Sequence, residues 1–230
     1  MRKLSRRHKE NIGKTENKIY SNLDEAIQIL KETATTKFVE SVELHVNLNI
    51  DPKYADQQLR TTVTLPHGIG KQVKIAVLTN EENYEEAKKA GADIVGNTEL
   101  IDTINQGTID FDLLIATPNL MPKLAKLGRV LGPKGLMPSP KSGTVSSTLT
   151  TTLTDFKKGK FEYKADKTGI VHVTIGKVDF TTSQLVENLK AFYDSIEKNR
   201  PSGVKGKYFK TLSICSTMGP SIKLDCNSFV

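Results

Sequence analysis

The sequence predicts a two-domain protein of mixed α/β and α+β class, in which a split α+β sandwich domain from both termini carries an inserted Rossmann-like α/β domain. Hydrophobic patterning is the first observation: apolar residues alternate at period two in the outer tracts and form nearly continuous runs in the middle tract. Charge is the second observation. Residues 1–67 carry a net +2, residues 68–158 carry +1 and residues 159–230 carry +4, so the basic excess lies at the two ends.

The first tract predicts one helix and two strands. Residues 23–32 have apolar side chains at helical spacing, with Ser21 or Asn22 as the N-cap. Apolar and polar residues alternate over residues 42–50, which predicts a strand with one buried face. Residues 60–66 predict a second strand that ends at a proline.

The middle tract predicts strands and helices in alternation. Apolar runs at 73–79 and 111–117 indicate strands covered on both faces, and residues 93–96 a shorter strand. Helices are expected at 80–92 and 97–107, each ending near a glycine. This order implies a small parallel sheet.

The last tract predicts strands at 169–180 and 208–219 on either side of a helix at 182–199. Each outer tract is too small to bury a core alone, so we expect the two to fold together. Both junctions, at residues 67–71 and 156–160, combine glycine with lysine, as an exposed two-strand hinge would.

The expected domains are therefore a discontinuous one, residues 1–67 plus 159–230, and an inserted one, residues 68–158. A net charge of +7 and a pI near 9.2 favour a polyanionic partner. No apolar run is long enough to span a membrane, so no membrane partner is expected. The start has no apolar segment of the kind a leader needs, and the basic arm at residues 2–18 is expected to be disordered.

No arrangement in the sequence has catalytic spacing, and we expect no catalytic residue, metal or cofactor. The glycine-rich segment at 127–145 fails the dinucleotide and Walker patterns in spacing, and its prolines prevent a following helix. Paired strands could bring His45 and His172 together, but no cysteine or carboxylate is expected to complete a metal site. Cys215 and Cys226 lack zinc spacing and are expected to be structural thiols.

Three stretches have the chemistry of an RNA contact. Lys37 and Phe38 adjoin just before a predicted strand, where a cation and a ring can bind a phosphate and a base. "STMGPS" ends the last strand with small hydrogen-bonding groups, and "ADKTGIVH" is a turn that enters another strand. The alternatives are that Phe38 is a core residue and that the other two stretches are ordinary turns.

Four motifs carry a family resemblance: "TKFVESVELHVNL", "GRVLGPKGLMPSPKSGTV", "KADKTGIVHVTIGK" and "STMGPSI". Together, and in this order, they resemble the large-subunit ribosomal protein L-one family over nearly the whole chain. "IDPKYADQQLRTTVTLPHG" and "NRPSGVKGKYFK" are most similar to its plastid and cyanobacterial branch. The resemblance implies a non-enzymatic ribosomal protein with the split and inserted domains described above.

By motif, the resemblance implies that the main rRNA contacts lie on the discontinuous domain. They are Lys37, Phe38, Ser41, Lys167, Thr168, Ser216, Thr217, Met218 and Gly219. It implies that Ser216 and Thr217 hydrogen-bond to the RNA while Met218 and Gly219 lie against its sugar-phosphate surface. A secondary contact with RNA or tRNA is expected on cations of the middle tract. They are Lys123, Lys126, Arg129, Lys134 and Lys141.

The implied partners are the stalk junction of large-subunit rRNA, exit-site tRNA, other ribosomal proteins and the protein's own mRNA, whose translation bacterial relatives repress. The implied location is the ribosome of a plastid (chloroplast) stroma or otherwise of a bacterial cytoplasm, with the free protein a monomer. Two other functions stay open from the residues themselves: a small α/β nucleotide-binding enzyme, and a basic RNA-binding protein without sequence preference.

Overall fold

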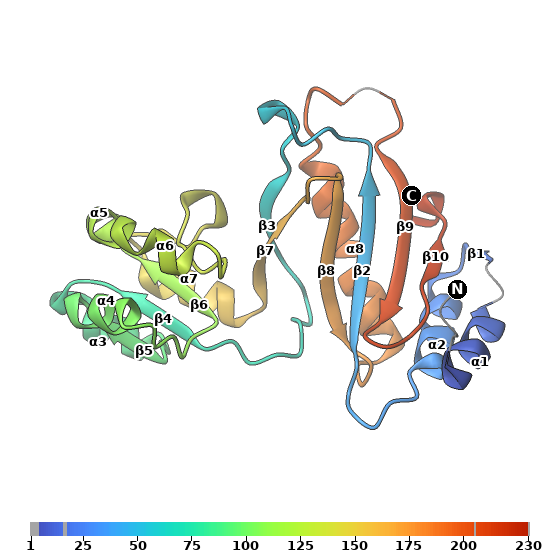
Figure 1. Ribbon diagram of the computed structural model, residues 1–230, viewed down its shortest axis with the longest axis horizontal. Helices are drawn as coiled ribbons and strands as arrows, with labels where there is room; N and C mark the ends of the chain where they lie inside the picture. Colours follow the sequence, from blue (N-terminus) through green and yellow to red (C-terminus); the bar gives the residue numbers. More distant parts are fainter. Residues whose placement is uncertain (1–4, 16–17, 205, 230) are drawn as a thin grey trace. The chain divides into compact units, whose positions relative to one another are not determined.

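The chain divides into two units, each with its own sheet (Figure 1). The computed structural model describes residues 5–15, 18–204 and 206–229. Unit 1 consists of Met1–Gly70 with Glu162–Val230, and unit 2 is Lys71–Phe161. In the structure the junctions follow residues 70 and 161. The sequence placed each of them three residues earlier, after residues 67 and 158.

Strands from both ends of the chain share the five-stranded sheet of unit 1, in the order β1-β10-β9-β2-β8. The period-two pattern produces it: the apolar residues of β2 are buried, and the alternate polar residues are partly exposed. β2 runs antiparallel to both β8 and β9 (Figure 1). The five strands are β1 (Ile19–Tyr20), β2 (Ser41–Leu48), β8 (Ile170–Lys177), β9 (Phe209–Ser216) and β10 (Ile222–Leu224).

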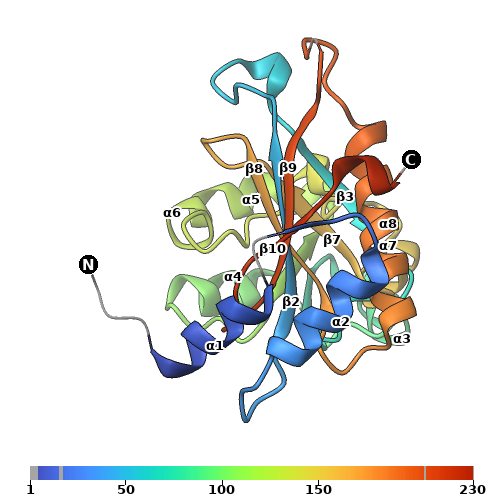
Figure 2. The ribbon, with the colours of Figure 1, turned by 90° about the vertical axis from the view of Figure 1, so that its right-hand side faces the viewer.

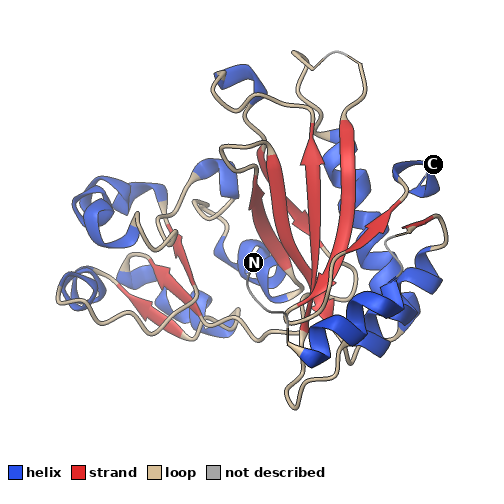
Figure 3. Cartoon of the chain, turned by 45° about the vertical axis from the view of Figure 1, so that its right-hand side comes forward, coloured by secondary structure: helices blue, strands red, loops and turns tan. Residues whose placement is uncertain are grey.

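Two amphipathic helices, α2 (Leu23–Thr33) and α8 (Thr182–Lys198), pack on the apolar face of this sheet (Figure 3). Of the two expected caps for α2, Asn22 is the N-cap, since its side chain accepts a hydrogen bond from the Asp24 amide. The polar residues of β2, β8 and β9 therefore lie on the opposite face.

The expectation of a disordered basic arm is wrong for residues 6–15, which form α1 (Arg6–Thr15) beside α2 (Figure 2). The contact uses polar groups: Asn11 is buried, and its Nδ2 donates to the Thr33 carbonyl at 2.8 Å. An apolar stripe would have predicted this helix, and the sequence has none there. Residues 2–4 and 16–17 of the arm lie outside the described residues.

β3 (Arg60–Thr64) and β7 (Lys160–Lys164) pair as a separate two-stranded sheet close to both junctions. The expectation of an exposed hinge over residues 156–160 is wrong at its start. Phe156 lies in the last turn of an unpredicted helix that ends at Lys157. Its ring is buried in the core of unit 2, so burial of this apolar side chain fixes the start of the segment.

Unit 2 contains the expected parallel sheet, in the order β5-β4-β6. Its strands are β4 (Ile75–Leu78), β5 (Ile94–Gly96) and β6 (Leu113–Ala116). Alternate residues of β4 enter two apolar clusters, one on each face of the sheet, which explains the continuous apolar runs. The helices are α3 (Tyr84–Lys89), α4 (Thr98–Asn105), α5 (Met121–Leu124), α6 (Gly128–Leu131) and α7 (Leu149–Lys157).

Short 3-10 turns connect these elements in both units. They are η1 (Ala55–Gln57), η2 (Glu81–Asn83), η3 (Pro118–Leu120), η4 (Ala125–Leu127), η5 (Pro140–Ser142) and η6 (Cys226–Phe229). Within the described ranges, no helix is both long and apolar enough to cross a membrane.

Candidate RNA interface

The start of β2 and the end of β9 meet at one end of the five-stranded sheet. The Thr217 amide donates to the Ser41 carbonyl at 3.1 Å, and the Ser41 amide donates to Thr217 Oγ1 at 3.0 Å. Lys177 of β8 adds a third strand, because its Nζ donates to Ser41 Oγ at 2.8 Å. Two of the expected contact residues, far apart in sequence, are thus held side by side. We call this region the β2–β9 end.

A buried carboxylate holds the turn of this end in place. Glu40 is only 2% exposed; its carboxylate accepts from the Met218 amide and from the Thr36 hydroxyl, both at 2.9 Å. Burial alone would raise the pKa of Glu40, but the Met218 amide, then the nearby Ser216 hydroxyl and the Thr36 hydroxyl, together outweigh it, so its pKa lies below the usual value. Sequence reasoning missed this residue because nothing local distinguishes it from a solvated acid.

Large apolar side chains at the β2–β9 end are exposed beside cations. Phe38 is 55% exposed and Met218 is 51% exposed. The alternative of Phe38 as a core residue is therefore wrong, and Lys37 next to it is also exposed. Arg7 of α1 was not predicted to take part, yet its Nη2 donates to the Met218 carbonyl at 3.3 Å. Cations, a ring and a thioether together suit a sugar-phosphate surface with an unstacked base.

Ser216 does not present its hydroxyl at the surface, which corrects the expectation of a direct contact. The residue is 1% exposed, and a Cβ on Gly219 would come within 2.4 Å of its Oγ. The Gly219 amide also donates to the Ser216 carbonyl at 3.1 Å. Ser216 and Gly219 therefore shape the turn that carries Thr217 and Met218.

Lys167 and Thr168 lie at the opposite end of the same sheet. Ser41 pairs with Lys177, whereas Asn47 pairs with Ile170, just after the turn that carries these two residues. Six residue steps of about 3.3 Å separate the two ends by roughly 20 Å. The expected contact residues therefore form two groups, and an RNA touching both would follow the polar face of the sheet.

Asp166 orders the turn at that opposite end. Its carboxylate accepts from Thr168 Oγ1 at 2.7 Å, the Thr168 amide at 2.8 Å and the Ile170 amide at 2.9 Å. The Thr168 hydroxyl and then the Ile170 amide hold the pKa of Asp166 below its usual value. Lys167 and Thr168 are exposed on this ordered turn.

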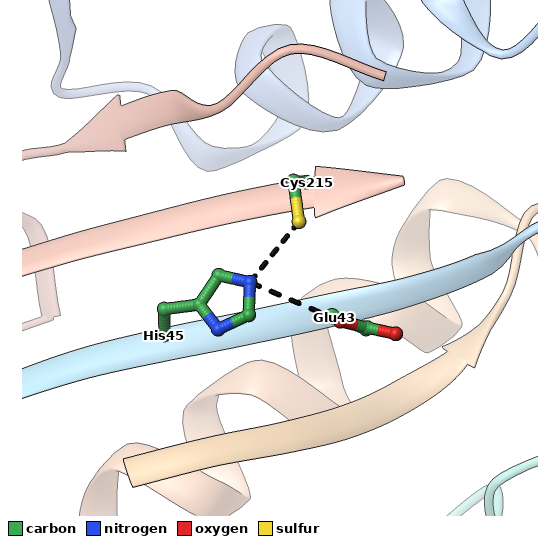
Figure 4. A group of neighbouring side chains, drawn as sticks. All are labelled: Glu43, His45 and Cys215. Atoms are coloured by element: carbon green, nitrogen blue, oxygen red, sulfur yellow. Dashed lines mark hydrogen bonds and ion pairs between the residues drawn. The ribbon is translucent and has the colours of Figure 1, made fainter. Parts of the chain in front are cut away.

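The polar face between the two ends carries a cluster that the sequence predicted only in part, as a possible meeting of two histidines. His45 Nδ1 lies 2.7 Å from His172 Nδ1. His45 Nε2 lies 3.1 Å from Cys215 Sγ and 3.9 Å from Glu43 Oε2 (Figure 4). The expectation that no cysteine or carboxylate joins these histidines is wrong. The register explains the meeting, since His45 pairs with His172 on one side and Glu43 pairs with Cys215 on the other.

Burial shifts the pKa values of two groups in this cluster, His45 and Cys215. It lowers the pKa of His45, and the neighbouring His172 lowers it further. It also raises the pKa of the Cys215 thiol to about 11, with a smaller contribution from the Glu43 carboxylate. Both groups are therefore neutral at neutral pH in the absence of a ligand.

The cations expected as a secondary contact lie on one uncompensated stretch of unit 2. Residues 113–154 contain five cations and no Asp or Glu. All five side chains are exposed. They are Lys123, Lys126, Arg129, Lys134 and Lys141. We call residues 113–154 the basic segment.

Exposed aromatic, apolar and cationic groups on a hydrogen-bonded sheet end are features of an RNA-binding protein. Residues 30–220 match the model of the Ribosomal protein L1p/L10e family, and the chain belongs to that family.

Curated relatives specify the branch of the family. The chain is 80% identical to "Large ribosomal subunit protein uL1c" of Phaeodactylum tricornutum, with both chains covered completely. It is 58% identical to "Large ribosomal subunit protein uL1" of Prochlorococcus marinus (strain MIT 9515), over 99% of this chain and 97% of that one. It is also 58% identical to the uL1c protein of Guillardia theta, over 100% and 97%. The resemblance to the plastid and cyanobacterial branch is confirmed, and these relatives are named as ribosomal proteins rather than enzymes.

Proposed function

We propose that this chain is a structural constituent of the large ribosomal subunit and binds the mobile-stalk junction of its rRNA through unit 1. Family membership and the names of the relatives support the subunit. The charge distribution supports rRNA binding by unit 1. This unit has 21 Lys and Arg against 16 Asp and Glu, whereas unit 2 has 12 against 10. The uL1c names of the algal relatives support a plastid ribosome as the location.

The observation that carries the proposal is the β2–β9 end. Phe38 and Met218 are exposed there although water disfavours large apolar surface, while hydrogen bonds hold the backbone beneath them. A surface ordered before binding loses little conformational entropy when RNA docks. Lys37 and Arg7 supply positive charge beside it, so base stacking and phosphate neutralisation can occur together.

Phe38→Ala tests the proposal in a filter-binding titration of the full chain against a stalk-junction rRNA fragment. Loss of one stacking or sugar contact weakens binding by about 1–3 kcal/mol. Tyr54→Ala is the matched control, because Tyr54 is a similarly exposed aromatic of unit 1, at 61% against 55% for Phe38, and follows the other end of β2. Equal losses for both variants, or none for either, contradict the proposed interface.

The basic segment supports a second contact, with deacylated tRNA at the exit site, whose release the protein assists. Five exposed cations without an acid among them give a field that attracts any phosphate backbone. Ribosomes carrying glutamine at all five positions should release exit-site tRNA at an altered rate while retaining the protein. An unchanged rate contradicts this part of the proposal.

The same β2–β9 end would bind the protein's own mRNA where that message imitates the stalk junction. Competition between the two RNAs for one site on the chain is the expected result. A chain that binds both at once, without competition, rules out repression through this surface.

The two other functions predict different measurements. A basic protein without preference binds any structured RNA as tightly as the stalk junction, whereas this interface favours the junction. A nucleotide-binding enzyme needs a phosphate site, but an open pocket of about 550 Å³ in unit 2 is lined by three glutamates and one lysine, Glu82, Glu85, Glu86 and Lys89, and so has a net negative charge. Like charges there repel a triphosphate, so ATP and GTP should leave the melting temperature unchanged.

A further inference from the structure

Three different metal-ligating groups converge on the polar face of the unit 1 sheet. His45 Nε2, Cys215 Sγ and a carboxylate oxygen of Glu43 all lie within 4.8 Å of one another (Figure 4). β2 and β9 supply them, so sheet hydrogen bonds fix their spacing. The Glu43 side chain is 39% exposed and that of His45 27%, which leaves the group open to solvent.

The separations suit a small tetrahedral ion. Zinc lies about 2.0–2.1 Å from nitrogen, 2.0–2.2 Å from oxygen and 2.3 Å from sulfur, so its ligand atoms stand roughly 3.3–3.6 Å apart. The observed 3.1 Å from nitrogen to sulfur and 3.9 Å from nitrogen to oxygen lie on either side of that range. The third separation, from Cys215 Sγ to a carboxylate oxygen of Glu43, is within 4.8 Å.

The neighbouring His172 lies against the other ring nitrogen of His45. Its Nδ1 is within hydrogen-bonding distance of His45 Nδ1, at 2.7 Å, while its Nε2 faces the Asp166 carboxylate at 3.7 Å. His45 Nε2 is the ring nitrogen that lies next to Cys215 and Glu43. Metal-ligating histidines are commonly oriented by such a hydrogen bond from the other ring nitrogen.

We propose that Glu43, His45 and Cys215 form a binding site for a borderline-soft divalent transition ion of the Zn²⁺ class, with the fourth position open to water. Imidazole, thiolate and carboxylate together are ligands that Zn²⁺ accepts. A neutral imidazole with two anions balances the double charge of the ion. Binding forms a Zn–S bond and breaks the S–H bond of Cys215, whose proton leaves to solvent.

Thiol protection in the unaltered protein tests the site. The full chain is alkylated with and without stoichiometric Zn²⁺, and each cysteine is quantified by peptide mass spectrometry. Cys215 should react at least tenfold more slowly with the ion bound, and a chelator should restore its rate. Cys226 is the internal control, since it is also free and partly exposed but lies outside the cluster. Equal rates with and without Zn²⁺ at Cys215 overturn the proposal.

Cobalt substitution identifies the ligands. Co²⁺ bound through Cys215 should give a thiolate-to-metal charge-transfer band with one ion per chain, and Zn²⁺ should displace it. Cys215→Ser and His45→Ala should abolish the band, while Cys226→Ser should retain it. His172→Ala should weaken binding about 10- to 100-fold, because it only orients His45. A band that survives Cys215→Ser, or one that disappears with Cys226→Ser, overturns the assignment.

The zinc site and the RNA interface fail separately. Phe38→Ala leaves all three ligands in place, and Cys215→Ser leaves the β2–β9 end intact. If the chain binds the stalk junction but Zn²⁺ does not slow the alkylation of Cys215, only the zinc site is contradicted.

Discussion

The β2–β9 end and the basic segment both expose cations to solvent, but they differ in how firmly the backbone beneath these side chains is held. At the β2–β9 end hydrogen bonds hold the backbone of both strand ends, such as those from Met218 to Glu40 and from Ser41 to Thr217. In the basic segment the charges stand on short helices and loops, and none of the five cations has an ion pair within the described part of the chain.

This difference separates geometric from electrostatic recognition. A tied surface can discriminate one RNA shape from another, because a wrong shape leaves its polar groups unpaired. Unpaired surface cations attract phosphates at any sequence, and salt weakens them. We therefore expect variants of the β2–β9 end to change specificity, and variants of the basic segment to change salt dependence.

The largest effect is expected from Glu40→Ala, which removes the buried carboxylate beneath the turn. The Met218 amide and the Thr36 hydroxyl lose their acceptor, at a cost of about 1–3 kcal/mol in the free energy of unfolding. Affinity for the stalk junction should fall by at least as much, since Met218 is no longer held. Urea titration measures the free energy of unfolding, and filter binding measures the affinity for the stalk junction. Glu32→Ala, at an exposed acid of α2, is the control and should change neither.

The Glu40 carboxylate should also make the free energy of unfolding depend on pH in the acid range. The folded-state pKa of Glu40 lies below the ordinary glutamate value of 4.5, so its contribution to stability is fully present above that value. The contribution is lost as the pH falls from 4.5 through the lowered folded-state pKa. The free energy of unfolding of Glu40→Gln should therefore depend less steeply on pH in this window. Equal slopes for variant and parent contradict a buried, ionised Glu40.

Thr217→Val is expected to have the next largest effect. The substitution keeps the shape but removes the oxygen that accepts from the Ser41 amide, so the two strand ends are joined there only by the bond from the Thr217 amide to the Ser41 carbonyl. Stalk-junction affinity should fall by about 1–3 kcal/mol, roughly 5- to 150-fold. Thr64→Val, at an exposed threonine of β3, should bind as the parent does. Equal affinity of Thr217→Val and the parent removes Thr217 from the interface.

A smaller effect is expected from Lys126→Gln with Arg129→Gln in the basic segment. Each lost phosphate contact reduces the slope of log affinity against log salt by about 0.7–0.9, so the slope for tRNA binding should fall by about 1.4–1.8 in total. Stalk-junction affinity should not change. Lys88→Gln with Lys89→Gln is the control, because these exposed lysines lie next to acids on α3. Equal slopes for both double variants contradict the role of the basic segment.

The smallest effect on stalk-junction affinity is expected from removing unit 2. A chain lacking residues 71–161, rejoined by a short glycine-rich linker, keeps the five-stranded sheet and both groups of proposed rRNA contacts. It should bind the stalk junction as tightly as the full chain and lose the salt-dependent tRNA contact. Circular dichroism checks that it folds. A folded variant that no longer binds the junction shows that the rRNA site requires unit 2.

Local pattern alone determined most elements of this protein. Alternation predicted β2, β8 and β9, helical spacing with a capping residue predicted α2 and α8, and continuous apolar runs predicted the parallel sheet of unit 2. These features depend on neighbours a few residues apart, so the sequence contains them directly. The motifs around Phe38 and Met218 likewise sufficed for the family.

Only the tertiary structure decided which distant groups meet. Strand register brings Cys215 to His45, and a turn closed by Gly219 buries Ser216, which motif analysis had expected at the surface. Glu40 became the support of the turn because it is buried opposite Met218, and α1 docks through Asn11 rather than through an apolar stripe. Pairing energies between remote segments leave no periodic trace in the chain, so sequence determined the elements and packing determined their contacts.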